Sequence, residues 1–355
     1  MFRQIVSSPF FLLTRLLVLP LVFFAVVEVQ ADELILKDGS RLLGTVVSKE
    51  DASLKFSTTF AGEITVSWDQ VVELRTEEPM KLMLDDDTLY QAKTIRNSDD
   101  AMVVEDAIVE QDSPVPPPRT LAQEEVPLIN PEPWRTGEGF KLTGHLNFAF
   151  ERERGNTDED EIDVDGDLLW RRRDDRFTMF GEWERDRKDN KKTKDQWNLD
   201  NAYNYFLTDK LFAGAYLGFK HDQFARLDLE SRIGPLLGYQ WFESTKINLS
   251  TQAGPIFINK DWENATTEQY LAAGWLINFD YYVIDDVMQF YHRNNGLWSL
   301  KETDNYTWDT WTGLRFPLIL GLVASTEIKT EYDNAAIGDT DKLDTTYSLK
   351  LGYAW

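Results

Sequence analysis

The sequence predicts an all-β protein: a C-terminal transmembrane antiparallel β-barrel of about 12 strands, preceded by a small SH3-like β domain. Three observations predict it. Residues 345–355 alternate strictly between large apolar and polar or small side chains. Eleven of the 12 tryptophans and 12 of the 13 tyrosines lie at or after Trp134. In most long alternating segments of this region the charges keep to one face, which is typical of a polar lumen inside a lipid-facing wall.

Composition narrows the class of protein further. With a formal net charge of −24, the chain is not expected to bind nucleic acid or anionic lipid headgroups, which are negatively charged themselves. The absence of cysteine excludes disulfides, thiolate metal sites, cysteine nucleophiles and a cysteine-linked lipid anchor. A mean hydropathy of −0.41 excludes a bundle of membrane helices but is compatible with a barrel, because barrel strands turn half of their residues to a polar lumen.

Residues 1–31 are predicted to be an export signal. Arg3 supplies the positive start, residues 16–27 form the apolar core, and the segment ending at Ala31 offers small residues before a cleavage site. A single membrane anchor over residues 10–27 is the alternative. Arg15 and Pro20 interrupt that run and favour the cleaved signal.

Residues 32–112 are predicted to form a small periplasmic β domain. Short alternating segments are separated by turn residues, and Gly39 marks the first tight turn. The stretch 36–42 resembles 83–89, so one β unit is expected to occur twice, and the unit resembles SH3-like barrels. A binding module for cell wall or a periplasmic partner and a simple spacer are equally compatible with this pattern.

Residues 113–133 are predicted to be a linker. Seven of the 13 prolines lie between Pro114 and Pro133, including three in succession at 116–118. Such a segment favours an extended polyproline conformation and acts as a semi-rigid spacer.

Residues 134–355 are predicted to form the outer-membrane barrel. Most alternating segments there have about nine residues or more, enough to cross an outer membrane when tilted, whereas soluble sheets average about five or six. An aromatic-rich soluble β-sandwich is the alternative. An even strand number places the start of the first strand and the end of the last strand on the same side of the barrel, beside the N-terminal domain. The segments are 141–151, 162–171, 177–184, 197–207, 211–220, 233–241, 247–257, 271–279, 287–293, 306–316, 322–332 and 345–355.

Short motifs in the same region are similar to those of known outer-membrane proteins. They are Gly155-Asn156-Thr157, Asp222-Gln223-Phe224 with Leu227, Arg232-Ile233-Gly234, Gly238-Tyr239, Gly254-Pro255 and the closing residues 347–355. With these motifs the chain resembles, over about 137–355, a family labelled salt-induced outer membrane proteins, which has no settled function. The resemblance implies a 12-stranded type of barrel in a Gram-negative outer membrane, and it supplies no catalytic residues.

The closing segment carries five large apolar residues on one face: Tyr347, Leu349, Leu351, Tyr353 and Trp355. The resemblance implies that this face is the signal read by the barrel-assembly machinery. Such chains often end in Phe, so Trp355 is a departure from the family pattern. Residues 235–237 also depart from it, because Pro-Leu-Leu replaces a more glycine-rich stretch, and disturbed strand pairing is expected there.

Six charged residues on two neighbouring predicted strands are expected to face the lumen: Asp163, Asp165, Asp167, Arg171, Glu182 and Glu184. Carboxylates on one strand are expected to pair with the arginines of 171–173 and 185–187 in structural ladders, because unpaired interior charge is costly. A charge filter for a small solute is the alternative.

Neither a metal site nor a cofactor site is predicted. The acidic run 158–167 lacks the spacing of a calcium loop, because Gly166 separates Asp165 from Asp167, and it is expected to be a solvated turn leading into a strand. His145, His221 and His292 have no metal-ligand spacing, and no serine lies in a nucleophile elbow. Polar lumen or rim positions are therefore expected for the histidines.

Taken together, these patterns favour a non-enzymatic outer-membrane barrel with a structural role or a role in small-solute passage, linked by the resemblance to salt stress. Its expected partners are outer-membrane lipid and the barrel-assembly machinery. A barrel lipid hydrolase and a periplasmic binding module anchored by a barrel are the alternatives.

Overall fold

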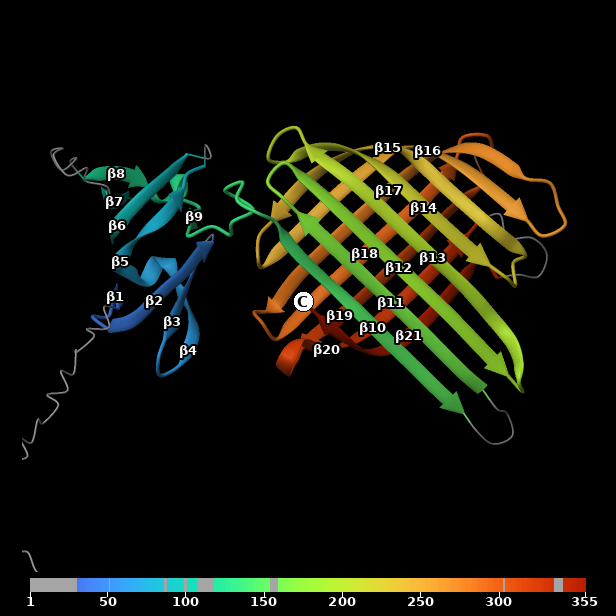
Figure 1. Cartoon of the computed structure of the whole chain (residues 1–355), viewed down its shortest axis with the longest axis horizontal. Helices are drawn as coiled ribbons and strands as arrows, with labels where there is room; N and C mark the ends of the chain where they lie inside the picture. The colour runs from blue at the N-terminus through green and yellow to red at the C-terminus, as the bar shows by residue number, and fades with distance from the viewer. Residues whose placement is uncertain are drawn as a thin grey trace, which may run out of the picture.

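The computed structural model describes residues 31–50, 52–85, 88–98, 101–106, 118–153, 159–302, 304–334 and 341–355. The predicted export signal, apart from Ala31, and the motif at 155–157 lie outside this part of the chain. The described residues form two β structures, an N-terminal sheet and a C-terminal closed barrel, joined by a short segment (Figure 1). No helix in these ranges is long and apolar enough to cross a membrane.

The N-terminal sheet, here called the module, has nine strands within the described residues, in the order β4-β3-β2-β1-β5-β6-β7-β8, with β9 pairing to both β2 and β5. The strands are β1 (Asp32–Leu36), β2 (Arg41–Glu50), β3 (Ser53–Thr58), β4 (Gly62–Ser67), β5 (Val71–Met83), β6 (Leu89–Asn97), β7 (Ala101–Asp106), β8 (Arg119–Ala122) and β9 (Leu128–Ile129). Their alternating apolar residues form one core that includes Leu34, Phe56, Leu74 and Ile95, all fully buried.

The two similar stretches of the module occupy equivalent places in two hairpins. In the β1–β2 turn the Leu36 amide donates to the Ser40 carbonyl at 2.9 Å, and in the β5–β6 turn the Leu84 amide donates to the Thr88 carbonyl at 2.9 Å. An equivalent hydrogen bond therefore closes both hairpins, 48 residues apart in the chain. The likeness of the module to SH3-like barrels stays a prediction.

Part of the range predicted as a linker, 113–133, belongs to the module. β8 pairs with β7, and β9 pairs with the ends of β2 and β5. Val126 and Ile129 are fully buried in the module core. The linker prediction rested on proline content, whereas here buried apolar side chains and backbone pairing hold residues from Arg119 to Ile129 against the sheet.

Twelve antiparallel strands close the C-terminal barrel within the described residues, as predicted. They are β10 (Lys141–Glu153), β11 (Glu159–Arg171), β12 (Asp175–Lys188), β13 (Lys191–Phe206), β14 (Leu211–Asp222), β15 (Leu227–Glu243), β16 (Ile247–Trp262), β17 (Glu268–Ile284), β18 (Met288–Ser299), β19 (Tyr306–Pro317), β20 (Leu322–Asp333) and β21 (Leu343–Ala354). Each strand pairs with its neighbours in sequence, and all of them run obliquely to the barrel axis (Figure 1).

The barrel closes where β10 meets β21. Their register pairs His145 with Ala354 and Phe148 with Leu351. Gly144 and Trp355 extend this seam, because each backbone amide donates to the other's carbonyl at 3.2 Å. The Trp355 ring lies directly against Gly144, so a side chain at this glycine would overlap it. Closure therefore depends on a position without a side chain.

The outer wall of the barrel is apolar, and the side chains that point inward are polar. On β21, Tyr347 and Leu349 are 76% and 78% exposed, whereas Lys350 between Leu349 and Leu351 is 5% exposed. Large exposed apolar residues recur on strands all around the barrel, including Leu142, Phe148, Leu217, Ile233, Leu237, Phe257, Leu271 and Ile328. An apolar surface of this extent needs hydrocarbon rather than water around it.

Aromatic pairs mark both rims of this wall. At the rim near the module, Tyr239 and Trp241 have ring centroids 4.8 Å apart. At the opposite rim the Tyr332 ring stacks on Tyr306 and Trp308, with centroids 5.7 and 5.4 Å away. Aromatic girdles at the two membrane–water interfaces are typical of outer-membrane barrels.

Strand pairing is disturbed at the Pro-Leu-Leu segment of β15. The β15–β16 ladder has no pair between Ile233–Phe257 and Leu237–Ala253. Pro235 and Pro255 both fall in this interval, and neither has a backbone N–H to donate. The disturbance thus follows from two prolines on adjacent strands.

Replacing Gly144 by alanine is expected to weaken barrel closure. The added Cβ would lie 2.5 Å from the Trp355 ring and 2.7 Å from the Asp167 carbonyl oxygen, and the backbone oxygen has little room to move. Overpacking of this kind costs about 1–3 kcal/mol. Unheated protein should lose part of its fast-migrating folded band in detergent gels, and this band should disappear at a lower temperature.

Gly181→Ala on β12 is the matched control. The nearest atoms to its added Cβ are the Leu199 Cδ1 at 3.4 Å and the Asn198 carbonyl oxygen at 3.6 Å. These are ordinary contacts, so this variant should migrate like the unmodified protein. If Gly144→Ala and Gly181→Ala had equal thermal stability, closure of the barrel would not depend on a glycine at position 144.

Candidate functional site

The charged residues predicted for the lumen all lie on the inner side of the barrel wall. Asp165, Arg171, Glu182 and Glu184 are each at most 7% exposed. The side chains of Asp163 and Asp167 are 20% and 17% exposed. Buried charges need partners, and residues on other strands supply them.

Lys329 on β20 forms ion pairs with carboxylates of β12 and of its own strand. Its Nζ lies 2.6 Å from Glu182, 2.8 Å from Glu184 and 3.2 Å from Glu331. Trp311 on β19 adds a hydrogen bond from its indole N–H to Glu182 at 3.0 Å. Lys329, Glu182, Glu184 and Glu331 are here called the Lys329 cluster. Because β12 and β20 are four strands apart around the barrel, the cluster reaches across the lumen.

Lys350 on β21 collects two carboxylates of β11 in a second group, the Lys350 cluster. Its Nζ lies 2.6 Å from Asp165, 3.0 Å from Asp163 and 2.9 Å from Glu327 on β20. Asn147 donates to Asp165 at 2.8 Å. One ammonium group thus holds three carboxylates away from water.

Asp167 is held by cations from the far side of the barrel. It lies 3.3 Å from Arg293 on β18 and 3.5 Å from Arg315 on β19. The Nδ1 atom of His145 on β10 lies 3.2 Å from the same carboxylate. The expected ladder with the arginines of 171–173 and 185–187 is therefore wrong for Asp163, Asp165 and Asp167. Their partners come from β10, β18, β19 and β21 instead, because side chains meet across the lumen as well as between adjacent strands.

Further contacts join side chains from strands on opposite sides of the barrel. Lys220 on β14 lies 3.7 Å from Glu331 on β20, six strands away in either direction around the closed barrel. The Arg293 guanidinium lies 4.8 Å from the centre of the Phe180 ring, and Phe180 packs edge-on against Trp311 at 5.0 Å. Because opposite walls are in side-chain contact at these positions, the lumen is obstructed there.

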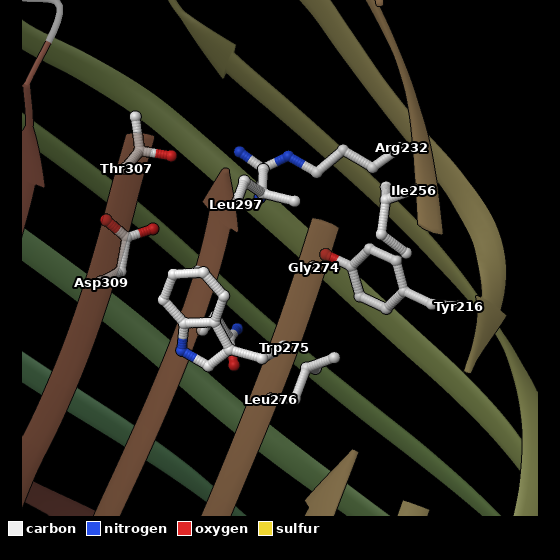
Figure 2. A pocket seen from close by; sticks show the side chains of 11 residues that line it. Tyr216, Arg232, Ile256, Gly274, Trp275, Leu276, Leu297, Thr307 and Asp309 are labelled. Atoms are coloured by element: carbon white, nitrogen blue, oxygen red, sulfur yellow. The ribbon is translucent and has the colours of Figure 1, made fainter. Parts of the chain in front are cut away.

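Figure 2 shows a small space inside the barrel and the side chains that line it. It is lined by Arg232 on β15, Trp275 on β17 and Asp309 on β19, among others, and its volume is about 20 Å³. A space of this size holds about one water molecule. The Trp275 ring fills the room left by Gly296 on the neighbouring strand, where a Cβ would lie 1.9 Å from the ring. Large side chains thus fill this part of the lumen.

At the end nearest the module the lumen widens into a cavity of about 600 Å³, here called the mouth cavity. Arg171 stands at its wall and forms a two-pronged ion pair with Glu243 on β15, at 2.9 and 3.0 Å. The cavity also reaches Asp200 and Asn295 deeper in the barrel and Lys55 of the module. It is large enough for a small solute.

The module is tied to this end of the barrel through Glu50. One carboxylate oxygen accepts a hydrogen bond from Arg135 at 2.9 Å, and the other accepts one from the Thr245 amide in the β15–β16 turn at 2.9 Å. Arg135 also donates to the Glu243 carbonyl at 2.8 Å. The guanidinium groups of Arg135 and Arg171 both lie against the Trp134 ring, 4.6 and 4.7 Å from its centre. Module and mouth cavity are therefore neighbours.

Glu132 stabilises the same joint. Burial would raise the pKa of this carboxyl, but the Trp134 indole N–H and the Lys141 ammonium outweigh it and lower the pKa below the ordinary 4.5. Glu132 therefore stabilises the folded chain above that pH, and its contribution is lost as the pH falls through the lowered value.

No group of three or more metal-ligating side chains suited to a metal ion occurs in the described ranges. The three histidines contact other groups. Nδ1 of His145 faces Asp167, that of His221 lies 2.8 Å from the Asp228 carbonyl, and that of His292 lies 2.8 Å from the Thr312 hydroxyl.

The sequence matches one family model over residues 146–355, described as "Protein of unknown function, DUF481". This match covers more than half of the chain. The chain belongs to the DUF481 family. No curated protein matches it. The name "salt-induced", suggested by the sequence motifs, is not part of the family's description.

Several solved structures of outer-membrane barrels are similar to this DUF481 chain. The NanC porin is 10% identical, covers 60% of this chain and 98% of its own, and has a TM-score of 0.37. The translocator domain of the autotransporter NalP from Neisseria meningitidis is 9% identical, with coverages of 62% and 88% and a TM-score of 0.34. The channel DcaP of Acinetobacter baumannii is 10% identical, with coverages of 92% and 94% and a TM-score of 0.30.

Replacing Glu50 by alanine is expected to loosen the module from the barrel. It removes the acceptor of two hydrogen bonds at the joint and should weaken docking by about 1–3 kcal/mol. Because the chain has no cysteine, spin labels can be placed at Thr59→Cys in the module and Asp209→Cys in the barrel. The distance distribution between the labels, measured by electron–electron double resonance, should broaden.

Glu105→Ala is the control, since Glu105 is an exposed module acid that pairs with Arg96 inside the module. It should leave the distribution unchanged. A Glu50→Ala distribution as narrow as that of the unmodified chain would show that the module is held by other contacts.

Proposed function

We propose that this DUF481 chain is an outer-membrane anchor of the Gram-negative envelope, with its barrel in the membrane and its module in the periplasm. Its lumen is closed, so the barrel holds the module at the membrane and does not act as a general pore. The observation that carries the proposal is the set of ion pairs that cross the lumen, above all Lys329 with Glu182 and Glu184 and Lys220 with Glu331.

The turn lengths support this orientation. At the module end the turns between consecutive strands are short, for example 172–174 between β11 and β12 and 244–246 between β15 and β16. At the other end the connections are longer on the whole, up to 334–342 between β20 and β21. Outer-membrane barrels have short periplasmic turns and longer external loops.

The outer wall supports insertion into lipid. Tyr347, Leu349, Leu351, Tyr353 and Trp355 form an exposed apolar face on the closing strand and its end. We propose that this face is recognised by the barrel-assembly machinery before the seam with β10 forms. Outer-membrane lipid then covers it.

Passage of a small solute is a second candidate function, and the mouth cavity favours it. The cavity extends from the module end to Asp200, Tyr216 and Asn295 inside the barrel. A solute that entered it would meet the Lys329 cluster and the Lys220–Glu331 pair as the remaining obstacles. Passage would need these side chains to rearrange, for example under osmotic stress.

Two other hypotheses find less support. A lipid hydrolase needs a hydroxyl nucleophile beside a base that an acid orients. Within the described residues only His292 of the three histidines is hydrogen-bonded to a hydroxyl, that of Thr312, and no acid is hydrogen-bonded to its ring, whereas His145 and His221 contact Asp167 and the Asp228 carbonyl. For the module, a role in binding cell wall or a periplasmic partner is a proposal. Pull-down with the full chain and with a Glu50→Ala variant would test it.

Removing Lys329, Glu182 and Glu184 from the Lys329 cluster is expected to open a water path. Lys329→Ala alone would leave Glu182 without its cation and Glu184 with Lys194 as its remaining cation, at a cost of about 3–5 kcal/mol, so Lys329, Glu182 and Glu184 are replaced by alanine together. In planar bilayers the unmodified protein should give no steady conductance steps, and the triple variant should give them.

The control replaces Lys301 and Glu302 by alanine. Both residues are exposed in the turn between β18 and β19, away from the lumen, so this variant should stay silent. Steady steps from the unmodified protein, equal in size to those of the triple variant, would overturn the closed-anchor proposal and favour solute passage.

A further inference from the structure

The mouth cavity carries more positive than negative side chains, unlike the chain as a whole. Eight lysines and arginines and five aspartates and glutamates are among the described residues that line it. The whole chain has a net charge of −24. The cations are Lys55, Arg135, Lys141, Arg171, Arg176, Lys246, Arg293 and Arg315. A cavity of this composition attracts small anions.

Most of these cations already have a carboxylate partner within the described residues, but Arg176 on β12 has none. Arg171 is paired with Glu243, Arg135 with Glu50, and Arg293 and Arg315 with Asp167. The Arg176 side chain is 5% exposed, and its Nε–H has no hydrogen-bond partner in this part of the chain. A buried guanidinium without an anion is costly, so this position calls for one.

Arg176 is held in a defined orientation. Its Nη1 donates to the Gln240 Oε1 at 2.6 Å, and its guanidinium lies over the rings of Phe206 and Phe212, 5.4 and 4.7 Å from their centres. Gln240, itself 2% exposed, is fixed in turn because its amide donates to the Phe242 carbonyl and to the Asn248 side chain, both at 2.7 Å. An arginine positioned in advance binds an oxyanion without paying again for its ordering.

The rest of the cavity wall suits a polar solute. Gln252 lines the cavity, and its buried Oε1 has no hydrogen-bond partner within the described residues. Asn248, Ser250 and Asn278 line it as well. The wall thus offers one unsatisfied donor at Arg176, one unsatisfied acceptor at Gln252, and further amide and hydroxyl groups.

We propose that Arg176 and Gln252 form a binding site for a small anionic solute, in which Arg176 binds a carboxylate or phosphate group and Gln252 accepts a hydrogen bond from the solute. Both groups match the flat fork of the guanidinium, which is why the two chemistries are tested side by side. The site opens toward the periplasmic module. It does not depend on whether the lumen conducts, so its test is separate from the conductance test.

The test is isothermal titration calorimetry on the full chain in detergent micelles at neutral pH, with inorganic phosphate and with succinate as probes. Ionic strength is held constant with chloride, so that general screening does not contribute. The unmodified protein should show saturable binding of at least one probe below about 10 mM. The preferred probe identifies the chemistry of the anionic group.

Two variants remove the site in different ways. Arg176→Gln removes the cation, and Gln240→Glu keeps the cation but supplies it with a carboxylate from the protein. Each should weaken binding about tenfold or more. Arg185→Gln is the matched control, because Arg185 is on the same strand at odd spacing from Arg176 and does not line the cavity. It should bind within about twofold of the unmodified protein.

The fast-migrating band of unheated protein in detergent gels verifies that each variant is folded. Gln240→Glu keeps the size of the side chain, so it remains informative if Arg176→Gln does not fold. Absence of saturable binding of both probes by the unmodified protein would overturn the proposal. So would a folded Gln240→Glu or Arg176→Gln variant that binds as tightly as the unmodified protein.

Discussion

The pairing of charges across the lumen is the interaction on which the rest of the barrel depends. The outer wall is apolar, so the polar residues of every strand must face inward. There they lie too far from bulk water to remain single ions, and they find partners on other walls. Lys329 and Lys350 each hold three carboxylates. The requirement to pair buried charge therefore both obstructs the lumen at these positions and joins opposite walls.

This closure is uneven along the barrel. Around Trp275 and Asp309 the side chains leave room for about one water molecule, whereas the module end holds a cavity of about 600 Å³. The module is attached at the wide end through Glu50. Module, joint and cavity thus lie together at one end of the barrel, and the more tightly packed part lies toward the other end.

Sequence alternation was sufficient to predict the 12 strands and the inward faces of Asp163, Glu182 and Glu184, because period-two patterning depends on neighbouring residues alone. Ion-pair partners could not be predicted in the same way. They depend on which strands face each other across the lumen, and this follows from barrel size and strand stagger. The strands β8 and β9 were not predicted, because their pairing also depends on distant parts of the chain. Their partners β7, β2 and β5 lie earlier in the chain, while the prolines near them indicate extended linker.

The Lys350 cluster has a consequence for how such a chain changes over generations. Lys350 is on the closing strand, Asp165 is on the second strand of the barrel, and Glu327 is on the one before the last. A substitution that neutralises the lysine leaves three acids facing one another, so it is tolerated best when an acid is lost as well. We therefore expect the residues at positions 163, 165, 327 and 350 to change together in related sequences, although they are as much as 187 residues apart in the chain.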